Sequence, residues 1–151
     1  MKFVIQRVSR ASVIINNSIY SSIENGLLLL IGIHKQDNDK NLDSYIKKII
    51  NMRIFNDQNG KMNYSILDVK GSILVVSQFT LLANTKKGNR PSYIESANPN
   101  LAKKLYNQFI RKLKNYEIIV KKGRFGAHMR LDFINDGPVT ILLGDDYEKT
   151  N

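Results

Sequence analysis

The chain has 151 residues, of which 42% are hydrophobic, and a formal net charge of +10. This length fits one domain with a core of its own, and no stretch is polar enough for long-range disorder. The sequence contains no cysteine, which excludes disulfides, thiolate metal sites and a cysteine nucleophile and fits a reducing compartment. Because His34 and His128 are the only histidines, a zinc site also lacks its usual ligands, and we expect no metal and no cofactor.

The sequence predicts neither export nor membrane insertion. The N-terminus reaches Gln6 and Arg7 too early for a signal peptide. The longest apolar run, residues 27–33, is far shorter than the roughly 20 residues that span a bilayer. We therefore expect a cytoplasmic protein.

The excess positive charge is concentrated in one segment. Residues 84–130 contain twelve Lys and Arg but only two acidic residues, whereas the rest of the chain has eleven residues of each sign. Such a field attracts polyanions, most commonly nucleic acid. The alternative is an ordinary solvated surface in a chain that is rich in lysine.

The first half of the chain predicts strands followed by a helix. Residues 4–8 and 12–15 resemble strands, with a hairpin turn at Asn16-Asn17 and a second turn at Asn25-Gly26. Residues 27–33 are apolar on both faces, as in a strand buried on both sides. A helix with Asp37 or Asp39 as its cap follows, because apolar residues recur at helical spacing at Leu42, Ile46, Ile49 and Ile50.

The second half predicts further strands around a second helix. Residues 56–60 indicate a turn, 72–79 a buried strand and 83–96 a mobile loop. Asn98 and Pro99 are typical of the start of a helix, and its apolar stripe is Leu101, Leu105, Phe109 and Leu113. Closing strands are expected at residues 116–120, 129–134 and 139–143.

Together these elements predict an α+β fold in a single domain. We expect a barrel-like, mostly antiparallel β-sheet with two flanking helices. The domain should span residues 1–144, followed by a polar C-terminal tail at 145–151.

Two polar strings at strand ends are the candidate sites. Ser77-Gln78-Phe79-Thr80 directly follows a buried strand, where backbone N–H groups released from the sheet could bind a carbonyl or an oxyanion. The other interpretation is an ordinary strand terminus. Asn135-Asp136-Gly137-Pro138-Val139-Thr140 consists largely of turn formers and could be a plain tight turn. It could also contain a cis Gly137–Pro138 bond, although only about 5–6% of X–Pro bonds are cis.

Other chemistries have weak support. The sequence has no phosphate-binding loop, dinucleotide fingerprint or nucleophile elbow. A catalytic triad could be assembled from Ser77, His128 and Asp132, but nothing in the spacing recommends it.

With both strings in view, the chain resembles the D-aminoacyl-tRNA deacylases, also called D-tyrosyl-tRNA deacylases, over nearly its whole length. The matching segments include the two polar strings and shorter motifs, namely Gln6-Arg7-Val8, Ala11-Ser12-Val13, Arg53-Ile54-Phe55, Gly60-Lys61-Met62-Asn63, Lys87-Gly88-Asn89-Arg90-Pro91-Ser92 and Gly123-Arg124-Phe125-Gly126-Ala127. Each motif alone is weak, but their order along the chain makes the resemblance strong. Tyr93, where Phe is common, and the longer tail are the departures.

The resemblance implies an enzyme that hydrolyses the ester of D-aminoacyl-tRNA, releasing the D-amino acid and tRNA, and that rejects the L form. Glycyl-tRNA that is wrongly charged is a second potential substrate. The resemblance further implies a homodimer whose two active sites lie at the subunit interface. Ser77–Thr80 of one chain would face a cis Gly137–Pro138 bond of the other.

The resemblance also assigns roles to residues. Phe79 and Thr80 would be catalytic, and the substrate would be bound by Ser77, Gln78, Gly137, Pro138, Arg7, Asn135 and Thr140. The tRNA backbone would contact basic residues of the charged segment, Lys86, Lys87, Arg90, Lys121, Lys122 and Arg124.

Two mechanisms and two rival functions are open at this point. Either Thr80 attacks the ester as a nucleophile, or water attacks with help from the ribose 2′-hydroxyl while backbone N–H groups of Phe79 and Thr80 stabilise the oxyanion. We favour water, because no His or Lys base is evident near Thr80 in the sequence. The rival functions are a non-catalytic RNA-binding module and an esterase or nucleotide hydrolase with a small substrate.

Overall fold

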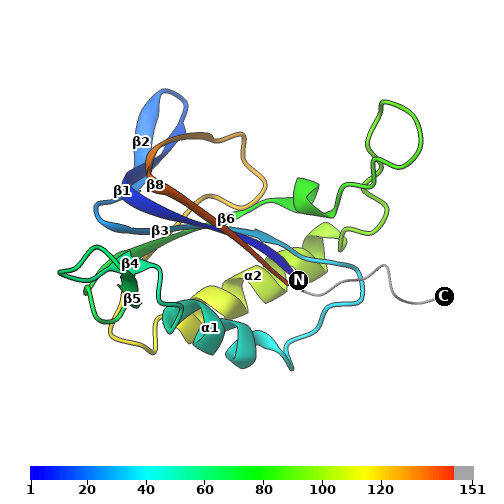
Figure 1. Cartoon of the computed structure of the whole chain (residues 1–151). Coiled ribbons are helices and arrows are strands. Elements are labelled where there is room, and N and C mark those ends of the chain that lie inside the picture. The colour runs from blue at the N-terminus through cyan, green and yellow to red at the C-terminus, as the bar shows by residue number, and fades with distance from the viewer. Residues whose placement is uncertain (145–151) are drawn as a thin grey trace.

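The computed structural model describes residues 1–144, so the predicted tail at 145–151 lies outside the described residues. In chain order the elements are β1 (Lys2–Ile15), β2 (Ser18–Ile23), β3 (Gly26–Gly32), α1 (Leu42–Ile50), β4 (Phe55–Asn56), β5 (Met62–Tyr64), β6 (Ser72–Ser77), the 3-10 helix η1 (Phe79–Leu82), α2 (Pro99–Leu113), β7 (Ile119–Lys122) and β8 (Arg130–Gly144). The predicted α+β class, a barrel-like sheet with two flanking helices, is confirmed (Figure 1).

The long strand β1 organises the sheet. Along one edge it pairs with β8 over nearly its whole length, and along the other it pairs first with β3 and then with β2, all antiparallel. β3 continues into β6 and β7 through parallel pairs. The Ser21 hydroxyl of β2 donates to the carbonyl of Lys122 in β7 at 2.9 Å. This contact joins the two ends of the strand order, and the sheet therefore curls toward a barrel.

Both helices pack on the same face of the sheet (Figure 1). Their apolar stripes meet inward-facing residues of β1, β3 and β6 in a core that contains Phe3, Leu29, Val75, Ile46 and Phe109. The hydroxyl of Tyr106, a buried residue of α2, donates to the carbonyl of Val75 at 2.9 Å, and burial raises the pKa of this phenol. This bond fixes α2 against the end of β6, where the candidate site lies.

The interior of the curled sheet holds a second, smaller core. Its buried members come from β1, β2, β3 and β6 and are Val8, Ala11, Val13, Ile23, Leu28, Leu74 and Val76. Because β3 and β6 contribute to both cores, they are apolar on both faces, as the sequence pattern of residues 27–33 predicts.

Local signals in the sequence were reliable where the interactions are local. Asn16 and Asn17 adopt positive φ values of 50° and 62° in the hairpin between β1 and β2. The side chain of Asn98 accepts the Leu101 N–H at 3.0 Å, and Pro99 occupies the first turn of α2.

The predicted cap of α1 is wrong. Asn41 occupies the N-cap position without a side-chain capping bond, and the helix begins at Leu42. The carboxylate of Asp37 instead accepts the backbone N–H of His34 at 2.7 Å and pairs with the Met1 ammonium at 2.8 Å.

The two closing strands predicted at 129–134 and 139–143 are parts of one strand, β8. The residues between them form a bulge rather than a chain reversal, because β1 continues to pair with β8 on both sides of it. The other closing strand, β7, begins at Ile119 rather than at residue 116.

Candidate active site

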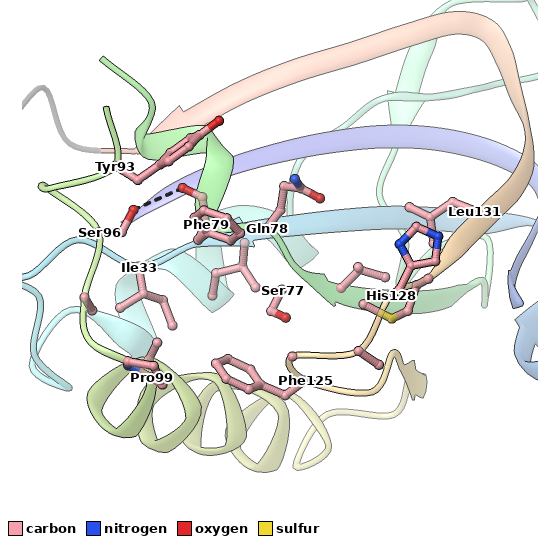
Figure 2. Close-up of a pocket in the computed structure, with 17 residues that line it drawn as sticks. Ile33, Ser77, Gln78, Phe79, Tyr93, Ser96, Pro99, Phe125, His128 and Leu131 are labelled. Carbon is pink, nitrogen blue, oxygen red and sulfur yellow. Dashed lines mark hydrogen bonds between the residues drawn. The ribbon is translucent and has the colours of Figure 1, made fainter. Parts of the chain in front are cut away.

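A cavity of about 620 Å³ opens beside the end of β6 (Figure 2). Segments that are far apart in the sequence form its walls: the ends of β3 and β6, the loop before α2 with the first turn of that helix, and the segment between β7 and β8. The lining residues include Ser77, Gln78, Phe79, Tyr93, Ser96, Phe125, His128 and Met129. Most of this lining is apolar, with a few polar groups directed inward, as is usual for small-molecule and cofactor sites.

The strand end carries two free backbone donors, on Phe79, which lines this cavity, and on the next residue, Thr80, which does not line it. The last sheet-like bond runs from the Gln78 N–H to the carbonyl of Ile31 at 2.8 Å. Phe79 then starts η1, in which the first N–H groups have no carbonyl to bond. Among residues 1–144, no acceptor takes the N–H of Phe79 or of Thr80. Such a pair of donors can hold an oxyanion.

The side chain of Thr80 is held by its neighbour. The side-chain amide of Gln78 donates to the Thr80 hydroxyl oxygen, and Gln78 is the only hydrogen-bond partner of that hydroxyl within residues 1–144. No histidine, lysine or carboxylate contacts it there. The geometry therefore provides no base to activate Thr80 as a nucleophile.

Aromatic rings flank the two donors. The Phe79 ring is 58% exposed, and the Tyr93 ring meets it edge-on with 5.0 Å between the ring centroids. On the opposite wall, Phe125 packs against Tyr106 of α2 at 5.7 Å. Flat apolar walls of this kind suit a planar heterocycle or an aromatic side chain.

The second polar string forms the bulge in β8. Gln6 pairs with Thr140 and Val8 pairs with Asn135, so residues 136–139 stand opposite the single residue Arg7. The Gly137–Pro138 peptide bond is cis, and both residues are exposed. We refer to residues 136–139 as the corner.

Asn135 closes the base of the corner. Its side-chain carbonyl accepts the Val139 N–H at 3.0 Å, and its amide donates to the Thr140 hydroxyl at 2.9 Å. The backbone on the two sides of the corner is thereby joined.

Arg7 supports the corner from beneath. Its side chain is 8% exposed, and its Nε donates to the Asp136 carbonyl at 3.0 Å. Its Nη1 donates to the Ile54 carbonyl at 2.8 Å and to Asn56 Oδ1 at 3.1 Å. A buried guanidinium with three acceptors is a rigid brace, since every bond involves a charged donor.

Within one chain the corner and the cavity are separate. None of the corner residues, and neither Arg7 nor Thr140, lines the cavity that holds Ser77, Gln78 and Phe79. Of the predicted site residues, only Ser77, Gln78 and Phe79 line this cavity, and Thr80 of the same string does not.

The basic residues predicted to bind tRNA are all exposed. Lys86, Lys87 and Arg90 belong to the loop that supplies Tyr93 to the cavity. Lys121, Lys122 and Arg124 lead directly into Phe125 on the opposite wall. Positive charge thus flanks the cavity along the chain on two sides.

Alternative chemistries gain no geometric support. In residues 1–144 no hydrogen bond joins Ser77, His128 and Asp132, and the carboxylate of Asp132 pairs with Arg10 at 3.0 Å. Within the same range, no three His, Asp or Glu side chains gather as metal ligands would. Neither described helix has the length and apolar character needed to cross a membrane.

Comparison with known proteins identifies the family. The family model described as D-Tyr-tRNA(Tyr) deacylase matches residues 4–144. The chain belongs to this deacylase family. The resemblance seen in the sequence is therefore confirmed, and the protein is a member of a family of hydrolases.

Individual members agree with this assignment. A D-aminoacyl-tRNA deacylase of Thermosipho africanus (strain TCF52B) is 54% identical over 143 residues, covering 95% of this chain and 96% of the relative. A D-aminoacyl-tRNA deacylase of Thermosipho melanesiensis (strain DSM 12029 / CIP 104789 / BI429) is 51% identical over 144 residues, with the same coverage.

Solved structures share the fold. One described as c-Myc DNA Unwinding Element Binding Protein has a TM-score of 0.90 and 42% identity, covering 97% of this chain and 99% of its own. Another, described as a probable eukaryotic D-amino acid tRNA deacylase, has a TM-score of 0.81 at 18% identity and covers 94% and 97%. At this lower identity the likeness concerns the fold alone.

Sequence reasoning did not identify two walls of the cavity in this deacylase family member. Tyr93 was noted only as a departure from the family pattern, Ser96 only as part of a loop, and His128 only as a member of a weakly supported triad. Phe125 belongs to one of the motifs that carry the family resemblance, which was the one available signal. That motif indicated the family but assigned no role to the Phe125 side chain.

Proposed function

We propose that this protein hydrolyses the ester bond of D-aminoacyl-tRNA, releasing the free D-amino acid and tRNA. The observation that carries the proposal is the pair of unbonded N–H groups of Phe79 and Thr80 at the end of β6, where Phe79 lines an aromatic-walled cavity, in a chain of the deacylase family. The two exposed basic stretches beside that cavity, ending at Arg90 and Arg124, support a polyanionic substrate.

In the proposed mechanism, water attacks the ester carbonyl with assistance from the ribose 2′-hydroxyl of the substrate. The carbonyl oxygen gains negative charge, which the N–H groups of Phe79 and Thr80 stabilise. The tetrahedral intermediate then collapses, the C–O bond to the ribose breaks, and the ribose oxygen takes up the proton that the attacking water has lost, which leaves the free D-amino acid and tRNA. The Gln78 bond to the Thr80 hydroxyl, and the absence of a base beside that hydroxyl within residues 1–144, support attack by water over attack by Thr80.

Selection between D and L isomers requires a rigid surface, because the two isomers carry identical groups and differ only in arrangement. We assign this role to the corner, where the main chain around Gly137–Pro138 would bind the amino group of the substrate. The brace of Arg7 and the bonds of Asn135 to Val139 and Thr140 support the assignment. Glycine has no side chain for this surface to exclude, so glycyl-tRNA should also be a substrate.

The corner would reach the cavity from a second copy of the chain. It is exposed and lies outside the cavity of its own chain. On β8, on the two sides of the corner, Ile134 is 48% exposed and Leu142 is 78% exposed, and a second copy would cover these apolar side chains. A homodimer with two isologous sites would satisfy both observations.

One assay tests the function directly. Purified protein is incubated with D-tyrosyl-tRNA and, separately, with L-tyrosyl-tRNA, and release of the amino acid is followed. Turnover of the D form alone supports the proposal. Binding of tRNA without turnover would indicate a nucleic-acid-binding module, a function to which the name of the 42% identical structure gives some weight. Neither turnover nor binding would favour a hydrolase of small molecules.

The affinity for tRNA should fall steeply with salt. Each Lys or Arg that contacts a phosphate releases counterions, so log K should decline linearly with log salt concentration. Base-specific readout should be minor, because many tRNAs must be served. The measurement is fluorescence anisotropy of labelled tRNA at increasing KCl. A flat salt dependence would contradict the assignment of the basic residues and leave the chemistry of the cavity untouched.

A further inference from the structure

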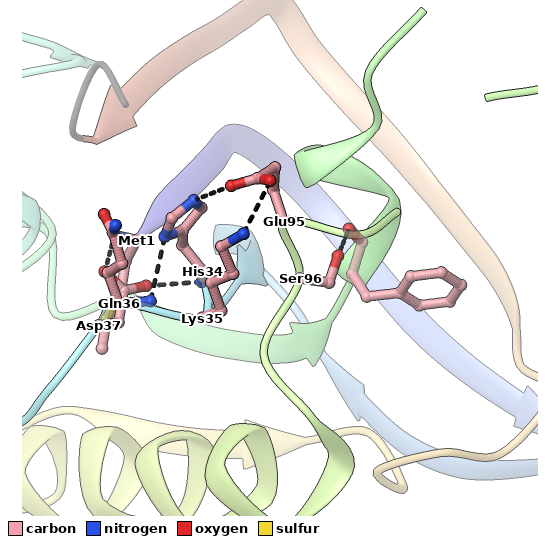
Figure 3. A network of polar contacts seen from close by, with 8 residues as sticks. Met1, His34, Lys35, Gln36, Asp37, Glu95 and Ser96 are labelled. Carbon is pink, nitrogen blue, oxygen red and sulfur yellow. Dashed lines mark hydrogen bonds and ion pairs between the residues drawn. The ribbon is translucent and has the colours of Figure 1, made fainter. Parts of the chain in front are cut away.

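The loop before α2 supplies a hydroxyl to the peptide group that carries one of the two proposed oxyanion donors. Ser96 Oγ lies 3.2 Å from the carbonyl oxygen of Phe79 and donates to it (Figures 2 and 3). That carbonyl and the N–H of Thr80 belong to the same planar peptide unit. The orientation of the carbonyl therefore fixes the orientation of the N–H.

We propose that Ser96 is a positioning residue for the reaction, acting through the Phe79–Thr80 peptide; the inference rests on the proposed function. A donor on the carbonyl side of a peptide draws electron density from the N–H side, so that the N–H becomes a stronger donor. It also restrains rotation of the peptide plane. Both effects favour an N–H that is already oriented and polarised when charge develops on the substrate.

The segment that carries Ser96 is tightly attached to the end of β3. The Lys35 N–H donates to the Glu95 carbonyl at 2.9 Å, and the Ala97 N–H donates to the Ile33 carbonyl at 2.8 Å. These bonds flank Ser96 on both sides, so its backbone is held as though it were a short additional strand.

The side chain of Glu95 adds a clamp to this attachment (Figure 3). One carboxylate oxygen accepts Lys35 Nζ at 2.9 Å, and the other lies 3.1 Å from Nε2 of buried His34. Because the Gln36 N–H donates to His34 Nδ1 at 3.1 Å, the ring hydrogen sits on Nε2 and is donated to Glu95. The Lys35 bond, followed by the contact with His34, lowers the pKa of Glu95, which stays ionised at neutral pH.

The clamp and the hydroxyl form one connection from β3 to the proposed oxyanion donor. A mobile loop could offer a serine to the Phe79 carbonyl only part of the time. Because two contacts hold Glu95, the Ser96 hydroxyl stays within hydrogen-bonding distance of the Phe79 carbonyl. The conformational entropy of this segment is therefore lost when the protein folds and not during the reaction.

The test compares Ser96→Ala with Ser96→Thr, which keeps a hydroxyl, and with Ser44→Ala, which removes an exposed serine on α1 that makes no such contact. We expect Ser96→Ala to lower kcat on D-tyrosyl-tRNA about three- to tenfold, the value of one neutral hydrogen bond, with KM within about twofold. Ser96→Thr should recover most of kcat. Ser44→Ala should change neither parameter.

A second measurement does not depend on turnover. In ¹⁵N-labelled protein, loss of the donor on the Phe79 carbonyl should move the Thr80 amide nitrogen resonance upfield in Ser96→Ala and leave it nearly in place in Ser96→Thr. If the unmodified protein is active but Ser96→Ala changes neither kcat nor the Thr80 resonance, the inference about Ser96 is overturned and the proposed function stands. A rise in KM at constant kcat would overturn it too, since Ser96 would then simply bind substrate. If the unmodified protein failed to release D-tyrosine, the proposed function itself would fail, and the role of Ser96 with it.

Discussion

At the scale of single residues, the proposed chemistry depends on main-chain N–H groups more than on side chains. Phe79 and Thr80 contribute donors that no acceptor in residues 1–144 uses, while the Thr80 hydroxyl is already engaged by Gln78. An enzyme built in this way should tolerate side-chain substitutions that would inactivate a serine-type hydrolase. Backbone substitutions should be far more damaging.

Phe79→Pro tests the backbone donor itself. Proline removes the Phe79 N–H at the first position of η1, where a proline is tolerated, and the preceding Gln78 lies outside the α region, with φ −144° and ψ 84°. Relative to Phe79→Ala, which loses the ring but keeps the N–H, we expect kcat to fall by a further 10²–10³, roughly the cost of one oxyanion donor. Single-turnover release of D-tyrosine measures it. Equal rates for the two variants would show that this N–H stabilises no charge.

Thr80→Ala tests the alternative nucleophile. The backbone N–H survives this substitution, so kcat should remain within about tenfold of the unmodified rate. The measurement is steady-state release of D-tyrosine, with circular dichroism and sedimentation to verify the fold and the assembly. A loss beyond roughly a thousandfold in a folded, assembled protein would instead favour a covalent acyl-enzyme on Thr80.

At the scale of elements, the corner is a bulge that β1 holds from both sides. Gly137 has φ +130°, and a Cβ there would lie 2.9 Å from Arg7 Nη2 and 2.8 Å from Val139 Cγ2. Only glycine fits this position without moving Arg7, because the guanidinium has little freedom among its three acceptors.

Gly137→Ala should therefore damage activity more than stability. Gly60→Ala is the matched control, since Gly60 also has a positive φ, +75°, but no atom lies within 4 Å of the added Cβ. Both variants place a side chain at a positive φ, so both should lose stability. Only Gly137→Ala should lower kcat/KM for D-tyrosyl-tRNA, by about 10²-fold, the scale of a small misplacement of a reacting group. Urea denaturation and deacylation assays on both proteins check this, and equal activity would mean that the corner plays no part.

The same elements show what the sequence could and could not predict. The capping of α2 by Asn98 was predictable because its partner lies three residues away. The role of Asp37 was not, since it depends on the chain terminus and on His34. Turn formers in residues 135–138 suggested a chain reversal, and only the pairing with distant β1 makes them a bulge.

The cavity was half predictable for a related reason. The apolar pattern of β6 is local, so the sequence predicted this strand, although β6 ends at Ser77 rather than at residue 79. Gln78 and Phe79 follow it and line the cavity. The walls at Tyr93 and Phe125 come from loops whose position beside β6 depends on the curl of the sheet and on the packing of α2. No periodicity within either loop records that approach.

At the scale of the whole molecule, the proposal joins two surfaces that one chain keeps apart. In the proposed dimer, the end of β6 in one chain would supply the donors and the corner of the other chain would supply a rigid wall. The basic stretches beside the cavity would then guide tRNA toward sites that exist only in the dimer. Dilution below the dissociation constant of the dimer should accordingly abolish turnover.

Mixing two defective chains tests this arrangement most directly. Phe79→Pro damages the cavity and keeps the corner, whereas Gly137→Ala damages the corner and keeps the cavity. In a mixed dimer, one site combines the intact cavity of one chain with the intact corner of the other. After the two variants are unfolded together and refolded in equal amounts, we expect D-tyrosyl-tRNA deacylation at roughly a quarter of the unmodified rate, because half of the dimers are mixed and each holds one intact site. Activity no higher than the average of the two variants refolded separately would contradict a site shared between subunits.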